Sequence, residues 1–172
     1  MFCFANGGYA VTQTGLLKGV ISDMKPLTAK ITHLYHSGFI VETINHLLIF
    51  DYTEPAGSLP TNSLSDGHLQ RSGLSSFQHV YVFISHHHED HFMRKILDWQ
   101  DWNPGIQVIA GYDVAMNPSP NRHSMNPDEK LKINEVMVES FGSTDAGVSF
   151  FVQVDQLSFF HAGDLNWWHW SD

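Results

Sequence analysis

Residues 80–91 read VYVFISHHHEDH, an apolar run joined directly to a cluster of histidines and acids. The β-branched and aromatic residues 80–84 predict a buried strand, which would place the cluster at the end of that strand. Neutral imidazole and carboxylate groups bind transition metals, and zinc, iron and manganese all suit this set. A histidine tag or a solvated loop could also be rich in histidine, but a tag lies at a chain terminus and lacks interleaved acids. The segment therefore predicts a metal site.

The spacing His86-x-His88-x-Asp90-His91 resembles the signature of the metallo-β-lactamase superfamily, whose members are mostly hydrolases with one or two metals. By this resemblance His86 and His88 would bind the first metal, and Asp90 and His91 would bind the second. Asp90 would also orient or deprotonate the attacking water, which makes it the candidate catalytic residue. His87 occupies a variable position of the motif and is expected to point away from the metals.

Two further strand ends extend the resemblance. Residues 159–164, FFHAGD, look like the family's later strand that ends in an acid, so Asp164 is the candidate bridge between the two metals. Residues 47–51, LLIFD, resemble an early strand whose acid supports the site without binding metal, although a turn or capping role explains Asp51 equally well. His36 lies in a segment that resembles the opening of this fold in some members, and it is expected to be structural.

The sequence departs from the family pattern at the third histidine of the first metal. Residues 140–147, SFGSTDAG, occupy the place of that histidine and contain none. Thr144, Asp145, a water molecule or His161 could substitute for it. His161 could instead be a core histidine bonded to the backbone. His123, the only histidine between the cluster and His161, is expected on a surface loop.

The resemblance implies an α/β (α+β) fold, a metallo-β-lactamase-like αββα sandwich. Residues 29–172 would form this domain, with its first half and the start of its second, and residues 1–28 would form an N-terminal extension. The chain ends at Asp172, before any counterpart of the family's last histidine ligand, which predicts a fragment or truncated product. The aromatic residues 167–170 are expected to be core side chains or to line a substrate pocket.

The apolar patterns predict a particular order of elements. A three-strand meander leads to the breaker-rich loop 53–77, the histidine cluster and a helix whose apolar face carries Phe92, Ile96 and Trp99. One more strand precedes a short turn and the second sheet. The predicted ranges are strands 29–35, 38–43 and 46–52, helix 91–102, strand 106–110, turn 128–132, and strands 135–141, 148–154 and 157–161.

Composition narrows the classes of partner. The net charge of -9 and the scattered Lys and Arg residues offer no basic stripe, which argues against nucleic acid and favours a small-molecule substrate. The single cysteine, Cys3, cannot form an internal disulfide, so the cytoplasm is the default location. No apolar run approaches the roughly 20 residues that span a bilayer, so no membrane association is expected.

The predicted function is metal-dependent hydrolysis of an ester, amide or phosphodiester-type small molecule. One or two zinc ions, or else iron or manganese, would lower the pKa of bound water towards about 7. Three further classes stay open: a non-catalytic or degenerate truncated metal-binding scaffold, a nucleic-acid phosphodiesterase and a redox protein with a di-iron site. A serine hydrolase has little support because the chain has no G-x-S-x-G motif.

Overall fold

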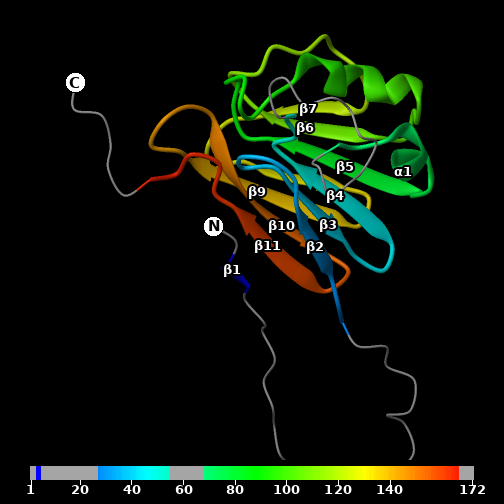
Figure 1. Ribbon diagram of the computed structural model, residues 1–172. Coiled ribbons are helices and arrows are strands. Elements are labelled where there is room, and N and C mark those ends of the chain that lie inside the picture. Colours follow the sequence, from blue (N-terminus) through cyan, green and yellow to red (C-terminus); the bar gives the residue numbers. More distant parts are fainter. Residues whose placement is uncertain (1–2, 5–26, 55–67, 167–172) are drawn as a thin grey trace, which may run out of the picture.

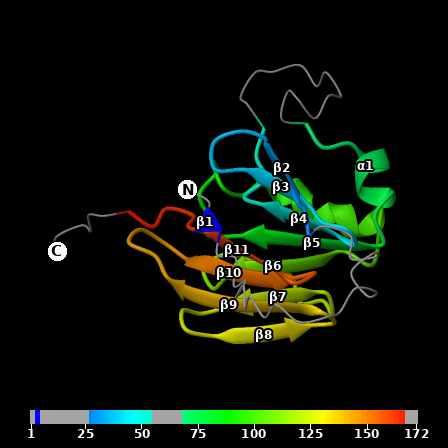
Figure 2. The same ribbon diagram turned by 90° about the horizontal axis from the view of Figure 1, so that it is seen from below.

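Two β-sheets stacked face to face form the body of the computed structural model, which describes residues 3–4, 27–54 and 68–166 (Figure 1 and Figure 2). The six-stranded sheet has the order β2-β3-β4-β5-β6-β7, and the five-stranded sheet has the order β1-β11-β10-β9-β8. Most of the loop predicted over 53–77 and the whole aromatic run 167–170 lie outside the described residues.

The six-stranded sheet contains the predicted meander followed by parallel strands. Its strands are β2 (Lys30–His33), β3 (Phe39–Glu42), β4 (His46–Phe50), β5 (His79–Ile84), β6 (Gln107–Gly111) and β7 (Arg122–Met125). Strands β2, β3 and β4 pair antiparallel, whereas β4 to β7 pair in parallel. The surface loop predicted around His123 is wrong, because this residue lies in β7 opposite Ile109. Sheet pairing determines this strand, since its own sequence, RHSM, carries no apolar alternation.

The five-stranded sheet is antiparallel throughout. It contains β1 (Cys3–Phe4), β8 (Lys130–Ile133), β9 (Val136–Gly142), β10 (Val148–Val154) and β11 (Leu157–His161). The last two match the predicted ranges. The turn predicted over 128–132 is wrong, because Leu131 and Ile133 pair with β9 and turn their apolar side chains towards the core. The predicted domain boundary at residue 28 stays a prediction.

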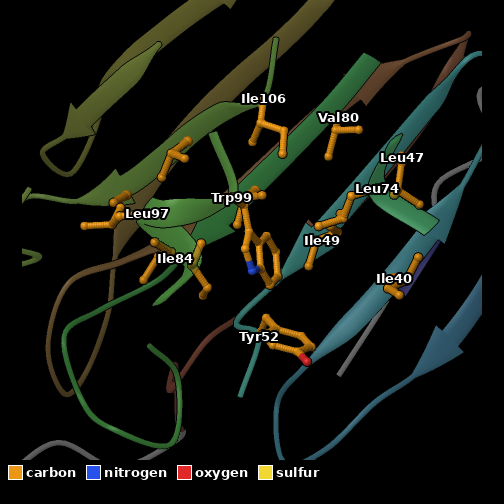
Figure 3. Close-up of a cluster of buried hydrophobic side chains, with 14 of the residues drawn as sticks. Ile40, Leu47, Ile49, Tyr52, Leu74, Val80, Ile84, Leu97, Trp99 and Ile106 are labelled. Atoms are coloured by element: carbon orange, nitrogen blue, oxygen red, sulfur yellow. The ribbon is translucent and has the colours of Figure 1, made fainter. Parts of the chain in front are cut away.

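Two hydrophobic clusters lie on opposite faces of the six-stranded sheet. Alternate residues of β4 and β5 separate them: Leu47, Ile49, Val80, Val82 and Ile84 face the helices, whereas Leu48, Phe50, Tyr81 and Phe83 face the second sheet. Helix α1 (Arg71–Ser75) and the 3-10 helix η2 (Arg94–Asp101) cover the first face. Their Leu74 and Trp99 pack over Ile49 and Tyr52 (Figure 3). The described residues thus form three layers, one helical and two of sheet.

The helix predicted over 91–102 is wrong in its type and its start. The backbone N–H groups of His91 and Phe92 both donate to the carbonyl of His88, so the metal-motif segment is a turn. The 3-10 helix begins only after this turn and still buries Ile96 and Trp99 on one face, as predicted. Neither described helix is long and apolar enough to cross a membrane.

Candidate metal centre

Asp51 holds the strand ends of both sheets together at one end of the sandwich. It follows β4 directly, lies fully buried and has a left-handed backbone, with φ 42°. One carboxylate oxygen accepts the Ser85 N–H at 2.7 Å. The second oxygen accepts from Ser85 Oγ at 2.7 Å, His91 Nδ1 at 2.8 Å and His161 Nε2 at 2.6 Å. The end of β4 therefore fixes the end of β5, the motif turn and the end of β11.

These bonds determine which nitrogen of each motif histidine carries the proton. A carboxylate only accepts, so His91 must donate from Nδ1, and its neutral ring would carry the electron pair on Nε2. Ser85 Oγ gives its proton to Asp51 and lies 2.9 Å from His86 Nδ1, which must then donate to it. His86 therefore also carries its electron pair on Nε2. This is how acids orient histidines that bind metals.

The two Nε2 atoms converge on Asp164. Both are buried and neither has a hydrogen-bond partner among the described residues. His86 Nε2 lies 3.8 Å from one oxygen of Asp164, and His91 Nε2 lies 3.2 Å from the second oxygen. A metal cation between these two nitrogens and the carboxylate would give all three groups an oppositely charged or electron-accepting partner. The side chains therefore fit a metal ion.

Seven residues form three overlapping groups that could hold a metal ion, each with two histidines and one carboxylate. Within each group the ligand atoms lie within 4.8 Å of one another. The groups are His86, His88 and Asp145; His36, Asp90 and His91; and His86, His91 and Asp164. All five metal residues predicted from the sequence belong to a group. The groups also contain Asp145, one of the possible substitutes for the third histidine, and His36, which was expected to be structural.

Asp145 is the residue that lies where the third histidine was expected. One of its oxygens is 3.4 Å from His88 Nδ1. Thr144 and His161, which could have filled the same place, bond elsewhere. Thr144 Oγ1 donates to the backbone carbonyl of Asp164 at 3.1 Å, and His161 donates to Asp51. His87 bonds to Asp113 at 2.7 Å and belongs to none of the three groups, as expected.

Two glycines let the loops that carry Asp145 and Asp164 approach the end of β5. Gly147 has φ 65°, and a Cβ there would overlap the carbonyl oxygen of Ser85. Gly163 has φ 54°, and a Cβ there would lie 2.8 Å from the Cβ of Ser85. Only glycine suits this combination of left-handed backbone and close contact. Both acids are therefore brought next to the motif histidines by close contact with one residue.

Burial and charge act in opposite directions on the ionisable groups of this end. Burial acts to raise the pKa of Asp51, but the charge and hydrogen bonds of His161 and His91 outweigh it and hold that pKa far below its usual range. Burial acts to lower the pKa of His91, but the hydrogen bond and charge of Asp51 raise it overall. The pKa of His86 is lowered by burial and by the charge of His91. The anionic form of Asp51 and the neutral form of His86 are thus both favoured, and the neutral form is the one in which a histidine binds metal.

The sequence missed the position of His36. It was expected to be structural, whereas its Nε2 lies 3.5 Å from Asp90 Oδ2 and its ring contacts the ring of His91 edge-on. A histidine beside Ser37 and Gly38 in a strand-to-strand turn was the only local signal. It could not reveal the contact, because His36 and Asp90 are far apart in the sequence.

No protein-family model and no curated protein matches the sequence. Solved structures do match it. A possible metal-dependent hydrolase from Veillonella parvula matches 83% of this chain with a TM-score of 0.54 and 13% identity. Igni18, a metallo hydrolase from Ignicoccus hospitalis, matches 78% with a TM-score of 0.53 and 19% identity. CmlA, a diiron β-hydroxylase from Streptomyces venezuelae, matches 81% with a TM-score of 0.51 and 13% identity.

These matches confirm the predicted metallo-β-lactamase-like fold, here with mostly strands in two sheets and few helices. Identities of this size show the fold alone. The chain spans 65% of the Veillonella structure, 60% of Igni18 and 30% of CmlA.

Proposed function

We propose that this chain is a metal-dependent hydrolase that acts on an ester, amide or phosphodiester-type small molecule through metal-activated water. One observation carries the proposal: two buried Nε2 atoms, neither with a hydrogen-bond partner among the described residues, face the two oxygens of a single carboxylate, Asp164. The fold shared with metal-dependent hydrolases supports it. The net charge of -9 supports a small molecule over nucleic acid.

The ligand groups support a centre of two ions, with zinc as the metal that suits imidazole and carboxylate donors. His86, His88 and Asp145 would hold the first ion. His91 and Asp90 would contribute to the second. Asp164 would bridge them, since one of its oxygens faces His86 and the second faces His91.

Asp90 is the proposed catalytic residue. Bound zinc supplies a water whose pKa lies near 7 and polarises the substrate oxygen under attack. The side chain of Asp90 is 53% exposed beside the buried His91, so its carboxylate can take a proton from an incoming water. Thr53 Oγ1 donates to the backbone carbonyl of Asp90 at 3.2 Å, which positions this turn.

A second candidate is a redox role with iron. Two histidines and one carboxylate are also the ligand set of many non-haem iron sites. CmlA, which shares the fold, is a diiron β-hydroxylase. Iron bound in preference to zinc by protein purified from cells grown with both metals would favour this candidate over the hydrolase.

The experiment is hydrolysis of chromogenic esters, amides and phosphodiesters by the zinc-loaded chain. We expect turnover that a chelator abolishes and that Asp90→Ala lowers by about 10²- to 10⁴-fold, as the loss of a proton-transfer group does. Glu89→Ala is the matched control, because Glu89 is exposed next to Asp90 and belongs to no ligand group. Equal activity of Asp90→Ala and the wild type would refute the role of Asp90. Zinc binding without turnover of any substrate class would support the non-catalytic scaffold.

A further inference from the structure

We propose that His36 is a ligand of the second metal ion, together with Asp90 and His91. The inference rests on the proposed metal centre and extends it to the turn between β2 and β3. One ring nitrogen of His36, one of His91 and a carboxylate oxygen of Asp90 lie within 4.8 Å of one another. The other two ligand groups among the described residues draw only on the motif and on the loops that carry Asp145 and Asp164. This group alone includes a residue, His36, from a different part of the chain.

The buried nitrogen of His91 is the first independent support. His91 Nδ1 is fixed as a donor by Asp51, so the nitrogen that the neutral ring offers to a metal is Nε2, which has no hydrogen-bond partner among the described residues. His91 can offer this one atom to only one ion. His86 has His88 and Asp145 as its own companions, so assigning His91 to a separate ion with His36 and Asp90 gives each ion two imidazoles and one carboxylate. Asp164 then touches both sets.

The backbone of His36 is the second support. Its φ of 50° is in the left-handed region, which residues with a Cβ seldom adopt. The turn holds this conformation through two contacts: His33 Nε2 donates to the carbonyl of His36 at 2.9 Å, and the Gly38 N–H donates to the carbonyl of Tyr35 at 2.7 Å. These bonds fix the turn from which the ring of His36 projects.

The ring of His36 is also supported in the orientation that a ligand needs. Ser37 Oγ lies 3.1 Å from Nδ1 and can accept its proton, which leaves the electron pair on Nε2. That nitrogen is 3.5 Å from Asp90 Oδ2. The ring of His36 meets that of His91 edge-on, with centroids 5.1 Å apart. A cation among the three side chains would neutralise the charge of Asp90 and bind one ring nitrogen each of His36 and His91.

The test is zinc titration of the full chain by calorimetry after removal of metal. We expect the wild type to bind two ions, and His36→Gly to lose one binding step or to weaken it at least about 100-fold, the upper end of the effect of losing a supporting residue. Glycine keeps the left-handed backbone, so the turn can still form. His87→Ala is the matched control, because His87 is an exposed histidine of the same cluster outside every ligand group. It should titrate like the wild type.

Histidine side-chain ¹H–¹⁵N spectra of the wild type provide a readout that does not depend on the zinc affinity of a variant. Zinc should shift the Nε2 resonance of His36, which is identified by its absence in His36→Asn. Two ions bound by both wild type and His36→Gly with equal affinity, or an unshifted His36 Nε2, would overturn this inference and leave the hydrolase proposal standing. A wild type that binds no zinc at all would overturn both.

Discussion

Two carboxylates, Asp51 and Asp155, tie the two sheets together at opposite ends of β4 and β11. Each has a left-handed backbone, with φ 42° and 48°. Each accepts four hydrogen bonds, including one from a histidine of the opposite sheet: His161 for Asp51, and His46 at 2.8 Å for Asp155. An aspartate bonded to a histidine of the opposite sheet therefore links the two sheets at both ends of the sandwich.

The two ends differ in what lies beyond the bonded histidines. At Asp51, His91 and, through Ser85, His86 turn their second nitrogens towards Asp164. At Asp155 the remaining partners are Thr43 and Asn45, and no group of three metal-binding side chains occurs there among the described residues. An aspartate–histidine pair between two sheets is thus no sign of a metal site by itself. The sign is a second nitrogen that faces another acid.

The sharpest test of this difference is Asp51→Asn. An amide in this place would turn N–H groups towards Ser85 or the histidines, which are themselves donors. We expect the free energy of unfolding of the metal-free chain to fall by about 3 to 5 kcal/mol, as when one partner of a buried ion pair is removed. We also expect zinc affinity to fall by about 10- to 100-fold. Urea denaturation and calorimetry measure the two effects, and unchanged zinc affinity in a folded variant would break the comparison.

Gly147→Ala tests whether the site end depends on close backbone contact. The added Cβ would overlap the Ser85 carbonyl and lie 2.6 Å from the Cβ of His86, on a backbone with φ 65°. The strain and overpacking should lower the free energy of unfolding by about 2 to 4 kcal/mol. Gly73→Ala is the control, since a Cβ at Gly73 meets nothing within 4 Å. Equal stability of the two variants would show that the Asp145 loop is not held as described.

Asp155→Asn should lower the free energy of unfolding by loosening the opposite end of the sandwich, without changing the zinc affinity. Burial acts to raise the pKa of Asp155, but hydrogen bonds from Thr43, His46 and Asn45 outweigh it and lower the pKa to about 2. A carboxyl whose pKa is lowered by folding stabilises the fold above its unfolded pKa, here by about 2 kcal/mol. The variant should lose this amount at neutral pH and bind zinc like the wild type. A loss of zinc affinity equal to that of Asp51→Asn would show that the two ends are not separate.

The same residue predicts a pH dependence. The stabilisation by Asp155 should be complete above about pH 5 and should disappear as the pH falls from its unfolded value of 3.8 through about 2. His46 faces this carboxyl and lies beside the ring of His79. The measurement is the difference in unfolding free energy between wild type and Asp155→Asn at several pH values. A difference that persists unchanged at the lowest pH would contradict the assignment.

Gln156→Gly should have the smallest effect. Gln156 has φ 61° in the hairpin turn beside Asp155. Glycine removes the left-handed strain but adds chain entropy to the unfolded state, so the free energy of unfolding should rise by no more than about 1 kcal/mol. Thermal unfolding measures this change. A clear loss of stability would mean that the side chain of Gln156, and not the turn backbone, supports this end.

The sequence predicted the elements whose own pattern is strong. The β-branched and aromatic runs of β4, β5 and β10 carry enough apolar residues to identify buried strands. Strand β7 was missed because pairing partners, not local pattern, decide it. Strand β8 was missed although its sequence, KLKI, alternates polar and apolar residues, because four residues give too short a pattern. The helix after the motif was misjudged because a turn closed by His88 precedes it. His91 of that turn is held by Asp51, which is 40 residues away in the sequence and so contributes nothing to the local pattern.

The part of the candidate site that comes from the short histidine motif and from an acid at a strand end was predicted from the sequence. His86, His88, Asp90, His91 and Asp164 all lie in ligand groups, and their metal-binding roles stay predictions. Three side chains could have replaced the third histidine, and only the contacts of Thr144 and His161 separate Asp145 from them. The position of His36 was missed, because sequence separation hides its approach to Asp90. The need for glycine at positions 147 and 163 follows from their close contact with Ser85, which the sequence does not show.

The most direct test of the difference between the two ends is anomalous diffraction at the zinc edge from crystals of the full chain grown with zinc. We predict peaks within bonding distance of His86 Nε2 and His91 Nε2, with Asp164 touching both ions, and no peak at His46 and Asp155. A folded chain with no zinc at His86 and His91, or with zinc at His46 and Asp155 instead, would contradict the account.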